Sequence, residues 1–488
     1  MALDPAAPAV ESNGRWWTWR DLATAADHVD GALHHAGLGA GAPIGVMLRN
    51  RPGPLGVVLG LLRAGACVVT VNPLLGRERL RADVAGLELP MLIGEPDDLA
   101  LLDLDALRPS TALVALGDLD GAFDLTLPTG PRRAFRAARG TAVRMLTSGT
   151  TGPPKRIDLG YETLELVMRG AKHYEQSGDA DLRLRDGVVI VSAPLVHVSG
   201  VFRVVQAVLD GRRIVLLERF TVDAWVDAVR RHRPKTVSLV PTALRMVLDA
   251  NVDPEVFDSV RSAVSGTAPL DPDVAEAFTE RYGVPVLTSY GATEFGGGVA
   301  GWNLADRRRY GGEKRGSVGR AHDGCELRVV DAELGTELPP GGVGLLEVRA
   351  AQLGTDEWVR TTDLARLDAD GFLWIVGRAD QTILRGGYKV QPEVVRAALE
   401  RDPAVKEAAV IGISDVRLGA VPVAAIERLP GREIDEASLL AHASSHLAPY
   451  ELPVAVSVVD ELPRTTSGKV DLAAIRALFD GVVATRGV

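Results

Sequence analysis

A run of small and hydroxyl-bearing residues is the most chemically suggestive feature of this sequence. It reads Thr147-Ser-Gly-Thr-Thr-Gly-Pro153, and Lys155 follows. Because glycine costs backbone entropy and Ser/Thr side chains compete for local hydrogen bonds, the run disfavours helix and strand. As a loop it offers many backbone N–H and hydroxyl donors beside one cation, which suits a polyphosphate. The Walker A pattern is absent, and the alternative interpretation is a Ser/Thr/Gly linker.

Further motifs follow this loop along the chain. They are Ser289-Tyr-Gly-Ala-Thr-Glu294, Trp358-Val-Arg-Thr-Thr-Asp363, Gly377-Arg-Ala-Asp380 and Pro463-Arg-Thr-Thr-Ser-Gly-Lys469. Each motif alone is weak, but their order and approximate spacing are specific. Together they resemble the adenylate-forming superfamily, which includes luciferases and peptide-synthetase adenylation domains. The resemblance is strongest to AMP-dependent acyl- and aryl-CoA ligases of the fatty-acid and coumarate type, and it spans nearly the whole chain.

The resemblance implies a site for ATP and Mg²⁺. Segment 147–151 and Lys155 would hold the β- and γ-phosphates. Thr293 would bond the α-phosphate, and Glu294 would bind Mg²⁺, a hard cation that takes oxygen ligands. Tyr290 would stack on adenine, while Asp363 and Arg378 would meet the ribose. The nucleotide-binding residues implied are Thr147, Ser148, Gly149, Thr150, Thr151, Gly152, Lys155, Ala268, Thr288, Ser289, Tyr290, Gly291, Asp363 and Arg378.

These residues also have simpler interpretations. Tyr290 fits a packed aromatic and Glu294 a solvated acid, whereas Asp363 fits a turn before Leu364. Asp380 matches the family's hinge, about which the C-terminal domain swings between half-reactions, although a loop aspartate is more often a turn former.

Lys469 is the main catalytic candidate. The resemblance implies that it bridges the attacking carboxylate and the α-phosphate, whereas an isolated lysine in a Ser/Thr/Gly loop is normally a solvated charge.

His197 resembles the gate residue of acyl- and aryl-CoA ligases, although a lone histidine at a strand end is usually structural. Arg203 fits either a contact to a second substrate carboxylate or a helix-surface arginine, and the second is favoured. The expected acyl pocket contains His197, Gly200, Gly266, Thr267 and Gly296.

Coenzyme A is the expected acceptor, contacted by Gly386, Gly387 and Lys389. Glycine lets the backbone approach a narrow thiol arm. Several departures from the family pattern flank this second half-reaction: Arg156 and Thr362 where glycine is usual, Leu384 where a basic residue is common, Arg396 in place of an acid, and a short segment before Trp358. An acceptor other than CoA, such as an amine, or an unusual oxyacid substrate is therefore the alternative.

Composition bounds the remaining classes of function. The chain of 488 residues exceeds one ordinary domain, and its net charge of −10 argues against nucleic acid or an anionic membrane as main partner. Cys67 and Cys325 lie far apart without metal-ligand spacing, so a reducing compartment is the simpler interpretation. The N-terminus lacks a signal-peptide pattern, and the longest apolar run is too short to span a bilayer. We expect a cytoplasmic enzyme for a small carboxylic acid.

The pattern of apolar residues predicts an α/β fold. Strands are expected at 67–71, 188–191, 213–217, 236–240 and 284–288, and helices at 54–62, 222–232 and 243–250. Apolar strands alternating with helices indicate layered sheets covered on both faces. Segment 316–374 predicts a small β-rich subdomain. After Gly377, helices at 394–401 and 436–447 and strands at 407–413 and 421–427 predict a compact α+β unit.

We therefore expect a large N-terminal AMP-binding domain over 1–379 and a small mobile C-terminal domain over 380–488, which carries Lys469. No acid stands at the His197 position to hold an α-amino group, which disfavours a peptide-synthetase domain. No carrier domain follows Lys469, so no attached carrier protein is expected, and a homodimer is possible. A catalytically silent nucleotide-binding protein is disfavoured by the joint presence of Lys469, Glu294 and Asp363, and a P-loop kinase by its missing loop.

Overall fold

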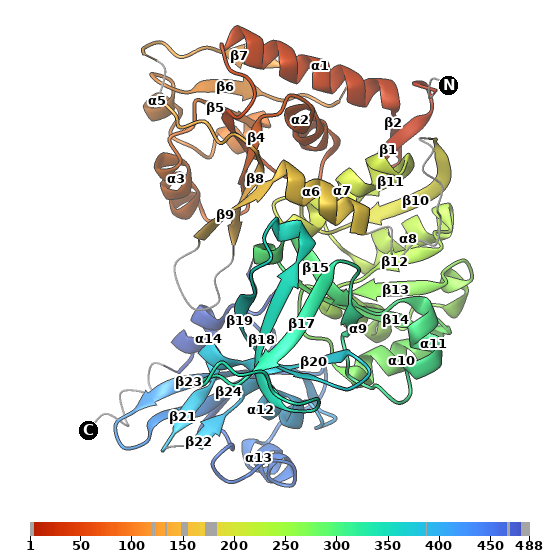
Figure 1. Ribbon diagram of the computed structural model, residues 1–488, viewed down its shortest axis with the longest axis vertical. Helices are drawn as coiled ribbons and strands as arrows, with labels where there is room; N and C mark the ends of the chain where they lie inside the picture. Colours follow the sequence, from red (N-terminus) through yellow and green to blue (C-terminus); the bar gives the residue numbers. More distant parts are fainter. Residues whose placement is uncertain are drawn as a thin grey trace.

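The computed structural model describes residues 4–479 except 120, 122, 132–133, 148–154, 171–182, 387 and 466–468. Two covered sheets and a mixed sheet build the larger part of the molecule, and a separate sheet builds the C-terminal part (Figure 1). Apolar strands alternate with helices through the first of these sheets, as the sequence pattern predicts. Within the described residues, none of the helices has the length and apolar character needed to cross a bilayer.

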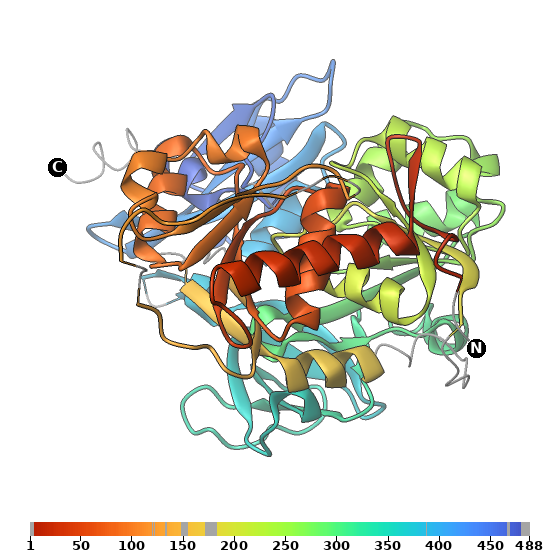
Figure 2. The ribbon, with the colours of Figure 1, turned by 90° about the horizontal axis from the view of Figure 1, so that it is seen from above.

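The first covered sheet has seven strands in the order β7-β6-β5-β3-β4-β8-β9. Its central strands are parallel, and β4 contains only buried residues. Helix α2 starts with proline at its first turn and packs beside α1, which lies across the top of the molecule (Figure 2). The bounds are α1 Trp19–His35, β3 Pro43–Met47, α2 Pro52–Arg63, β4 Cys67–Val71, α3 Arg77–Gly86, β5 Met91–Gly94, α4 Pro96–Leu99, α5 Leu104–Leu107, β6 Ala112–Ala115, β7 Asp124–Thr126, β8 Thr141–Thr147 and β9 Lys155–Gly160.

The second covered sheet has four strands in the order β10-β11-β1-β2. Helix α8 illustrates how the sequence fixes an element here. Thr221 accepts a hydrogen bond from the Ala224 amide at its start, and basic residues fill its last turn. The bounds are β1 Pro8–Ser12, β2 Arg15–Thr18, α6 Tyr161–Gly170, β10 Arg185–Val191, α7 Val198–Leu209, β11 Arg212–Leu216 and α8 Val222–His232.

The mixed sheet has nine strands in the order β12-β13-β14-β15-β16-β20-β19-β18-β17. Its first three strands are parallel, and the rest are antiparallel. The expected β-rich segment is present, and β15 joins it to the parallel strands in one continuous order. The bounds are β12 Thr236–Ser238, α9 Pro241–Asp249, η2 Pro254–Phe257, β13 Ser262–Ser265, α10 Pro272–Tyr282, β14 Val286–Ala292, η3 Thr293–Phe295, β15 Gly297–Gly301, α11 Leu304–Tyr310, β16 Gly319–Ala321, β17 Cys325–Val330, β18 Val343–Ala350, η4 Ala351–Leu353, β19 Val359–Leu367 and β20 Phe372–Arg378.

The C-terminal sheet runs β22-β21-β24-β23, with β25 pairing along β24. Two apolar clusters on it draw all their buried residues from Ile383 onward, so this part of the chain has a core of its own. The bounds are η5 Ala379–Gln381, β21 Ile383–Arg385, β22 Tyr388–Val390, α12 Pro392–Leu399, β23 Val405–Asp415, β24 Gly419–Arg428, α13 Glu436–Ser444, β25 Val456–Val459 and α14 Leu472–Ala477.

Candidate active site

The ends of the expected phosphate loop are held by a strand pair. Thr147 closes β8 and lies opposite Lys155, the first residue of β9. Residues 148–154, which include Ser148, Gly149, Thr150, Thr151 and Gly152, lie outside the described residues. Arg156, which departs from the family pattern, donates to the Thr70 carbonyl at 2.9 Å and to Asp83 at 2.6 Å. This arginine therefore anchors the base of the loop to the first sheet.

Strand β14 carries the expected adenine-side residues Thr288, Ser289, Tyr290 and Gly291. The Tyr290 hydroxyl donates a hydrogen bond to Asp363 in β19. Burial raises the pKa of Tyr290, and the nearby Asp363 charge raises it further. The phenol is therefore a stable donor that holds the Asp363 carboxylate in place. Its ring is partly buried against the mixed-sheet core, so the role of an adenine platform stays a prediction.

Asp363 and Arg378 lie directly opposite each other on β19 and β20, so their side chains share one face of the sheet. The turn interpretation of Asp363 is wrong because the residue lies inside a strand, where paired backbone leaves no turn. Burial raises the pKa of Asp363, whereas Tyr290 and Arg378 oppose this shift. The Arg378 guanidinium donates to Asp380 at 2.8 and 2.9 Å and to the Thr362 hydroxyl at 2.7 Å. The expected ribose residues and the expected hinge residue thus form one cluster.

The Mg²⁺ candidate Glu294 lies on η3, directly after β14. Its side chain is exposed, and its charge acts on both Asp363 and Lys469. The described residues include no cluster of three potential metal-ligand side chains. Magnesium at nucleotides commonly takes most of its oxygen ligands from phosphate and water, so one protein carboxylate such as Glu294 is compatible with a magnesium site. Nothing is described of the Thr293 side chain.

The loop after β13 contains a strained residue at a predicted site position. Thr267 adopts φ 73, a left-handed conformation that is a real outlier for a β-branched side chain. Such strain is commonly kept where function needs it. Its neighbour Gly266 faces Ser289, because an added Cβ would lie 2.6 Å from the Ser289 hydroxyl. Ala268 follows with its side chain exposed. The loop therefore lies against β14 at the expected nucleotide residues.

His197 is the N-cap residue of α7 and makes no side-chain capping bond. Burial lowers the pKa of its imidazole to about 4, and the charge of Lys469 adds to this. His197 is therefore neutral at physiological pH. Gly200, on the next turn, packs so closely that an added Cβ would lie 2.2 Å from the Pro194 carbonyl. A side chain at this position would displace the start of α7.

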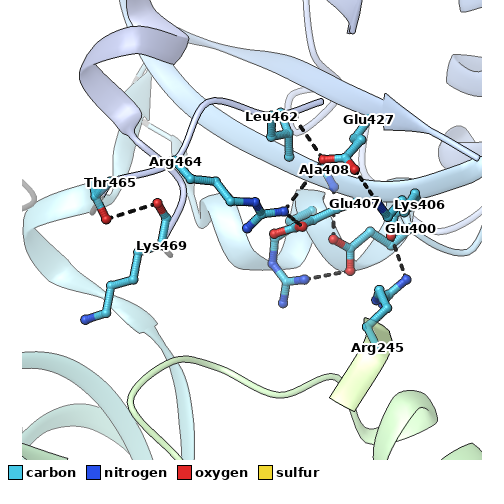
Figure 3. A network of polar contacts seen from close by, with 11 residues as sticks. Arg245, Glu400, Lys406, Glu407, Ala408, Glu427, Leu462, Arg464, Thr465 and Lys469 are labelled. Carbon is cyan, nitrogen blue, oxygen red and sulfur yellow. Dashed lines mark hydrogen bonds and ion pairs between the residues drawn. The ribbon is translucent and has the colours of Figure 1, made fainter. Parts of the chain in front are cut away.

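Lys469 comes from the C-terminal part and faces the other candidates. Burial lowers its pKa, the charge of Arg378 adds to the shift, and Glu294 opposes it. The side chain keeps contact with solvent. The Lys469 carbonyl accepts hydrogen bonds from the Thr465 amide at 2.7 Å and from the Thr465 hydroxyl at 3.2 Å, which close the loop (Figure 3). Residues of both parts of the molecule therefore meet around Lys469.

Ion pairs fix the Lys469 loop to the C-terminal sheet. Arg464 donates to Glu407 at 2.5 Å, and Glu427 accepts from the Leu462 amide at 2.9 Å and from Lys406 at 2.5 Å (Figure 3). The Lys406 carbonyl in turn accepts from Arg245 of α9 at 2.6 Å. Sequence reasoning missed Arg245, since nothing near it in the chain indicates a distant partner.

The expected CoA loop begins at Gly386, which adopts φ +55 and donates its amide to the Leu418 carbonyl at 2.7 Å. Gly387 lies outside the described residues. Lys389 and Leu384 are exposed, and the exposed Tyr388 stacks on Tyr450 with ring centroids 4.3 Å apart. The surface near Gly386 is therefore open to solvent.

The departure at Arg396 also has a structural explanation. Arg396 donates to Glu393 at 2.7 Å and to Glu400 at 2.6 Å. Burial opposes its charge, but the two carboxylates outweigh burial and raise the pKa of Arg396. Arg396 thus links Glu393 in the first turn of α12 to Glu400 at its C-terminal end. Glu400 also accepts a hydrogen bond from the Ala408 amide.

Comparison with known proteins agrees with this arrangement. The profile of the AMP-binding enzyme family matches residues 1–355, and that of the AMP-binding enzyme C-terminal domain matches residues 395–469. The chain belongs to the AMP-binding enzyme family. Its similarity to 2-succinylbenzoate–CoA ligase of Bacillus pumilus is 29% identity over 96% of this chain and 94% of that protein. Sulfoacetate–CoA ligase of Cupriavidus necator is 30% identical over 94% of this chain and 92% of that protein. Indoleacetate–CoA ligase of Aromatoleum aromaticum is 29% identical over 98% of this chain and 96% of that protein.

Solved structures of this AMP-binding enzyme family share the fold. ATP-bound MatB from Rhodopseudomonas palustris superposes with a TM-score of 0.83 at 27% identity, covering 98% of this chain and 97% of that one. The apo form of the same protein gives a TM-score of 0.69 at 26% identity, covering 98% of this chain and 97% of that one. The amide bond synthetase McbA from Marinactinospora thermotolerans gives 0.80 at 26% identity, covering 97% of each chain. A large N-terminal and a small C-terminal domain are thus the family's architecture.

Proposed function

We propose that this AMP-binding enzyme is an AMP-forming acid–CoA ligase, which activates a carboxylic acid with ATP and passes the acyl group to coenzyme A. The observation that carries the proposal is the meeting of Lys469 with Glu294, Arg378 and His197, since these residues come from both domains and influence one another's charge. All three curated relatives named above are acid–CoA ligases.

In the first half-reaction a carboxylate attacks the α-phosphate of ATP, so two anions must approach each other. In this proposal the Lys469 ammonium contacts both, and such preorganised charge is commonly the largest single contribution to the rate. The neutral His197 borders the acid without adding charge. Asp363, held by Tyr290, accepts hydrogen bonds from the ribose hydroxyls. Mg²⁺ held at Glu294 with the phosphates would neutralise part of their charge.

The domain arrangement supports the first half-reaction. This chain superposes better on ATP-bound MatB than on apo MatB. We propose a boundary at residues 379/380, with Asp380 as the hinge residue. Rotation about this point would carry Lys469 away and bring Gly386 to the adenylate. The Arg378–Asp380 pair then links a nucleotide-binding residue to the hinge.

Coenzyme A is the favoured acceptor because of Gly386. Its left-handed backbone and missing side chain let a thiol arm approach the sheet closely. The second candidate acceptor is an amine. The similarity to an amide bond synthetase favours it, together with the apolar, exposed Leu384 at a position where CoA ligases often have a basic residue. Buried, free Cys67 and Cys325 support a cytoplasmic location.

A panel of carboxylic acids tests the proposal. Purified protein with Mg²⁺, ATP, CoA and one acid at a time should release AMP and pyrophosphate in equal amounts, with one thioester formed per AMP. ADP and phosphate as stoichiometric products would contradict the adenylation. Pyrophosphate release without any thioester, and an amide when an amine is added, would favour the second acceptor.

A further inference from the structure

Arg203 lies on α7, six residues after the N-cap residue His197, and the structure shows its side chain partly buried without a carboxylate partner among the described residues. The favoured interpretation from the sequence is a helix-surface arginine, but the structure shows its side chain partly buried. Burial alone lowers the pKa of its guanidinium, with no neighbouring charge involved. Three other partly buried arginines are paired with carboxylates: Arg49 with Asp98, Arg156 with Asp83 and Arg396 with Glu400. Among the described residues, no carboxylate pairs with Arg203.

The surroundings of α7 place Arg203 beside the expected acyl pocket. The preceding residue, Phe202, packs on the start of β15, where an added Cβ on Gly297 would lie 3.4 Å from its ring. Gly296 lies against Thr163 of α6. Helices α6 and α7 therefore both lie against Gly296 and Gly297 at the start of β15. Arg203 follows Gly200 of the expected acyl pocket by three residues, so the two residues lie on the same face of α7.

A partly buried cation without a partner lowers the free energy of unfolding. Proteins retain such destabilising residues where binding of a ligand requires them. The rise of a helix puts Arg203 about 9 Å along the axis from His197. An anionic group several bonds from the reacting carboxylate would span that separation. Guanidinium binds carboxylate and sulfonate oxygens through paired hydrogen bonds. The acids in the names of the three relatives differ in this respect: 2-succinylbenzoate and sulfoacetate carry a second anionic group, whereas indoleacetate has one carboxylate.

We infer that Arg203 is a specificity residue for acids with a second anionic group, a carboxylate or a sulfonate, at the end remote from the reacting carboxylate. The inference rests on the proposed function. The reacting carboxylate is activated between Lys469 and His197, and the second anion pairs with Arg203. A monoacid of the same length leaves Arg203 buried and unpaired, which disfavours its binding.

Matched pairs of acids test this inference through pyrophosphate release. The pairs are malonate with propanoate, succinate with butanoate, glutarate with pentanoate, and 2-succinylbenzoate with each of its two analogues in which one carboxylate is replaced by methyl. Sulfoacetate and 3-sulfopropanoate test the sulfonate. The wild type should prefer the dianionic member of at least one pair by about 10²-fold in kcat/KM. Arg203→Met should remove that preference by lowering kcat/KM for the dianionic acid alone, and Arg203→Lys should retain part of it.

Arg230→Met is the matched control, because Arg230 is exposed on α8. It should leave the preference unchanged. A thermal melt with and without ATP shows that each variant is folded, and Arg203→Met should have a melting midpoint equal to or above that of the wild type. Equal use of monoacids and diacids by the wild type, or an unchanged preference in a folded Arg203→Met variant, would overturn the inference while leaving the proposed function intact. Absence of pyrophosphate with every acid would overturn the proposed function, and the inference with it.

Discussion

His197 and Lys469 show how the fold sets the charge of single side chains. Burial lowers the pKa of both, but the consequences differ because their ordinary values differ. An imidazole with a pKa of about 4 is neutral at every physiological pH, whereas the lowered pKa of Lys469 starts from an ordinary value of about 10.4, far above that range. Of the two residues, we therefore expect only Lys469 to supply positive charge to the reacting phosphate.

The pH dependence of adenylation follows from the state of His197. Because its pKa lies at about 4, we expect kcat/KM for the acid to lack a histidine limb near the ordinary value of about 6.5. Pyrophosphate release measured from pH 5.5 to 7.5 tests this point, with the acid chosen so that its own carboxylates are ionised throughout. His197→Asn should leave the shape of the profile unchanged. A limb in the wild type that His197→Asn removes would show that the imidazole titrates in the active site.

At the scale of elements, local patterns predicted much of the fold. The strand Cys67–Val71 and the helix Val222–His232 were expected with the bounds that the structure has, because apolar runs and caps act within the segment itself. The joining of β15 to β16 and β14 could not be predicted, since pairing between distant segments leaves no local signal. The left-handed Thr267 and the bond from Arg245 to Lys406 were missed for the same reason. Motifs supplied the site residues, and their roles stay predictions.

The turn at Gly386 offers a test of the acceptor at this scale. Gly386→Val should lower thioester formation by about 10-fold or more while sparing adenylation, because valine is strained at φ +55 and its side chain blocks close approach. Gly431→Val is the control, since Gly431 has φ +75 and open space around it. Pyrophosphate release and thioester yield are measured separately. Equal loss of both half-reactions in Gly386→Val, with Gly431→Val active, would mean that this turn supports the fold and not the acceptor.

At the scale of the whole molecule, a chain of contacts runs from the N-terminal domain to Lys469. Arg245 of α9 holds the Lys406 carbonyl, the Lys406 ammonium pairs with Glu427, and Glu427 holds the amide of Leu462 before the Lys469 loop (Figure 3). These contacts join α9 to the C-terminal sheet in the present orientation. A rotation that removes Lys469 from the active site has to break the Arg245 bond.

Removal of this bond should change the balance between the two orientations. Arg245→Ala should slow adenylation by about 5–30-fold, the equivalent of ~1–2 kcal/mol, because hydrogen bonds to charged groups are worth about this much. Transfer from a supplied acyl-adenylate to CoA should be unaffected or faster. Arg432→Ala, at an exposed position of the C-terminal domain, is the control. Adenylation at the wild-type rate in Arg245→Ala would show that the contact does not hold the domains.

The half-reactions of Lys469→Ala test the central claim most directly, namely that the C-terminal domain delivers this lysine for adenylation and then withdraws it. With ATP and the best acid, pyrophosphate release should fall by about 10²–10³-fold, because one preorganised charge is lost. With a supplied acyl-adenylate and CoA, thioester formation should continue at nearly the wild-type rate, since Lys469 has left the site. Equal loss of both half-reactions, or retention of both, would contradict this account.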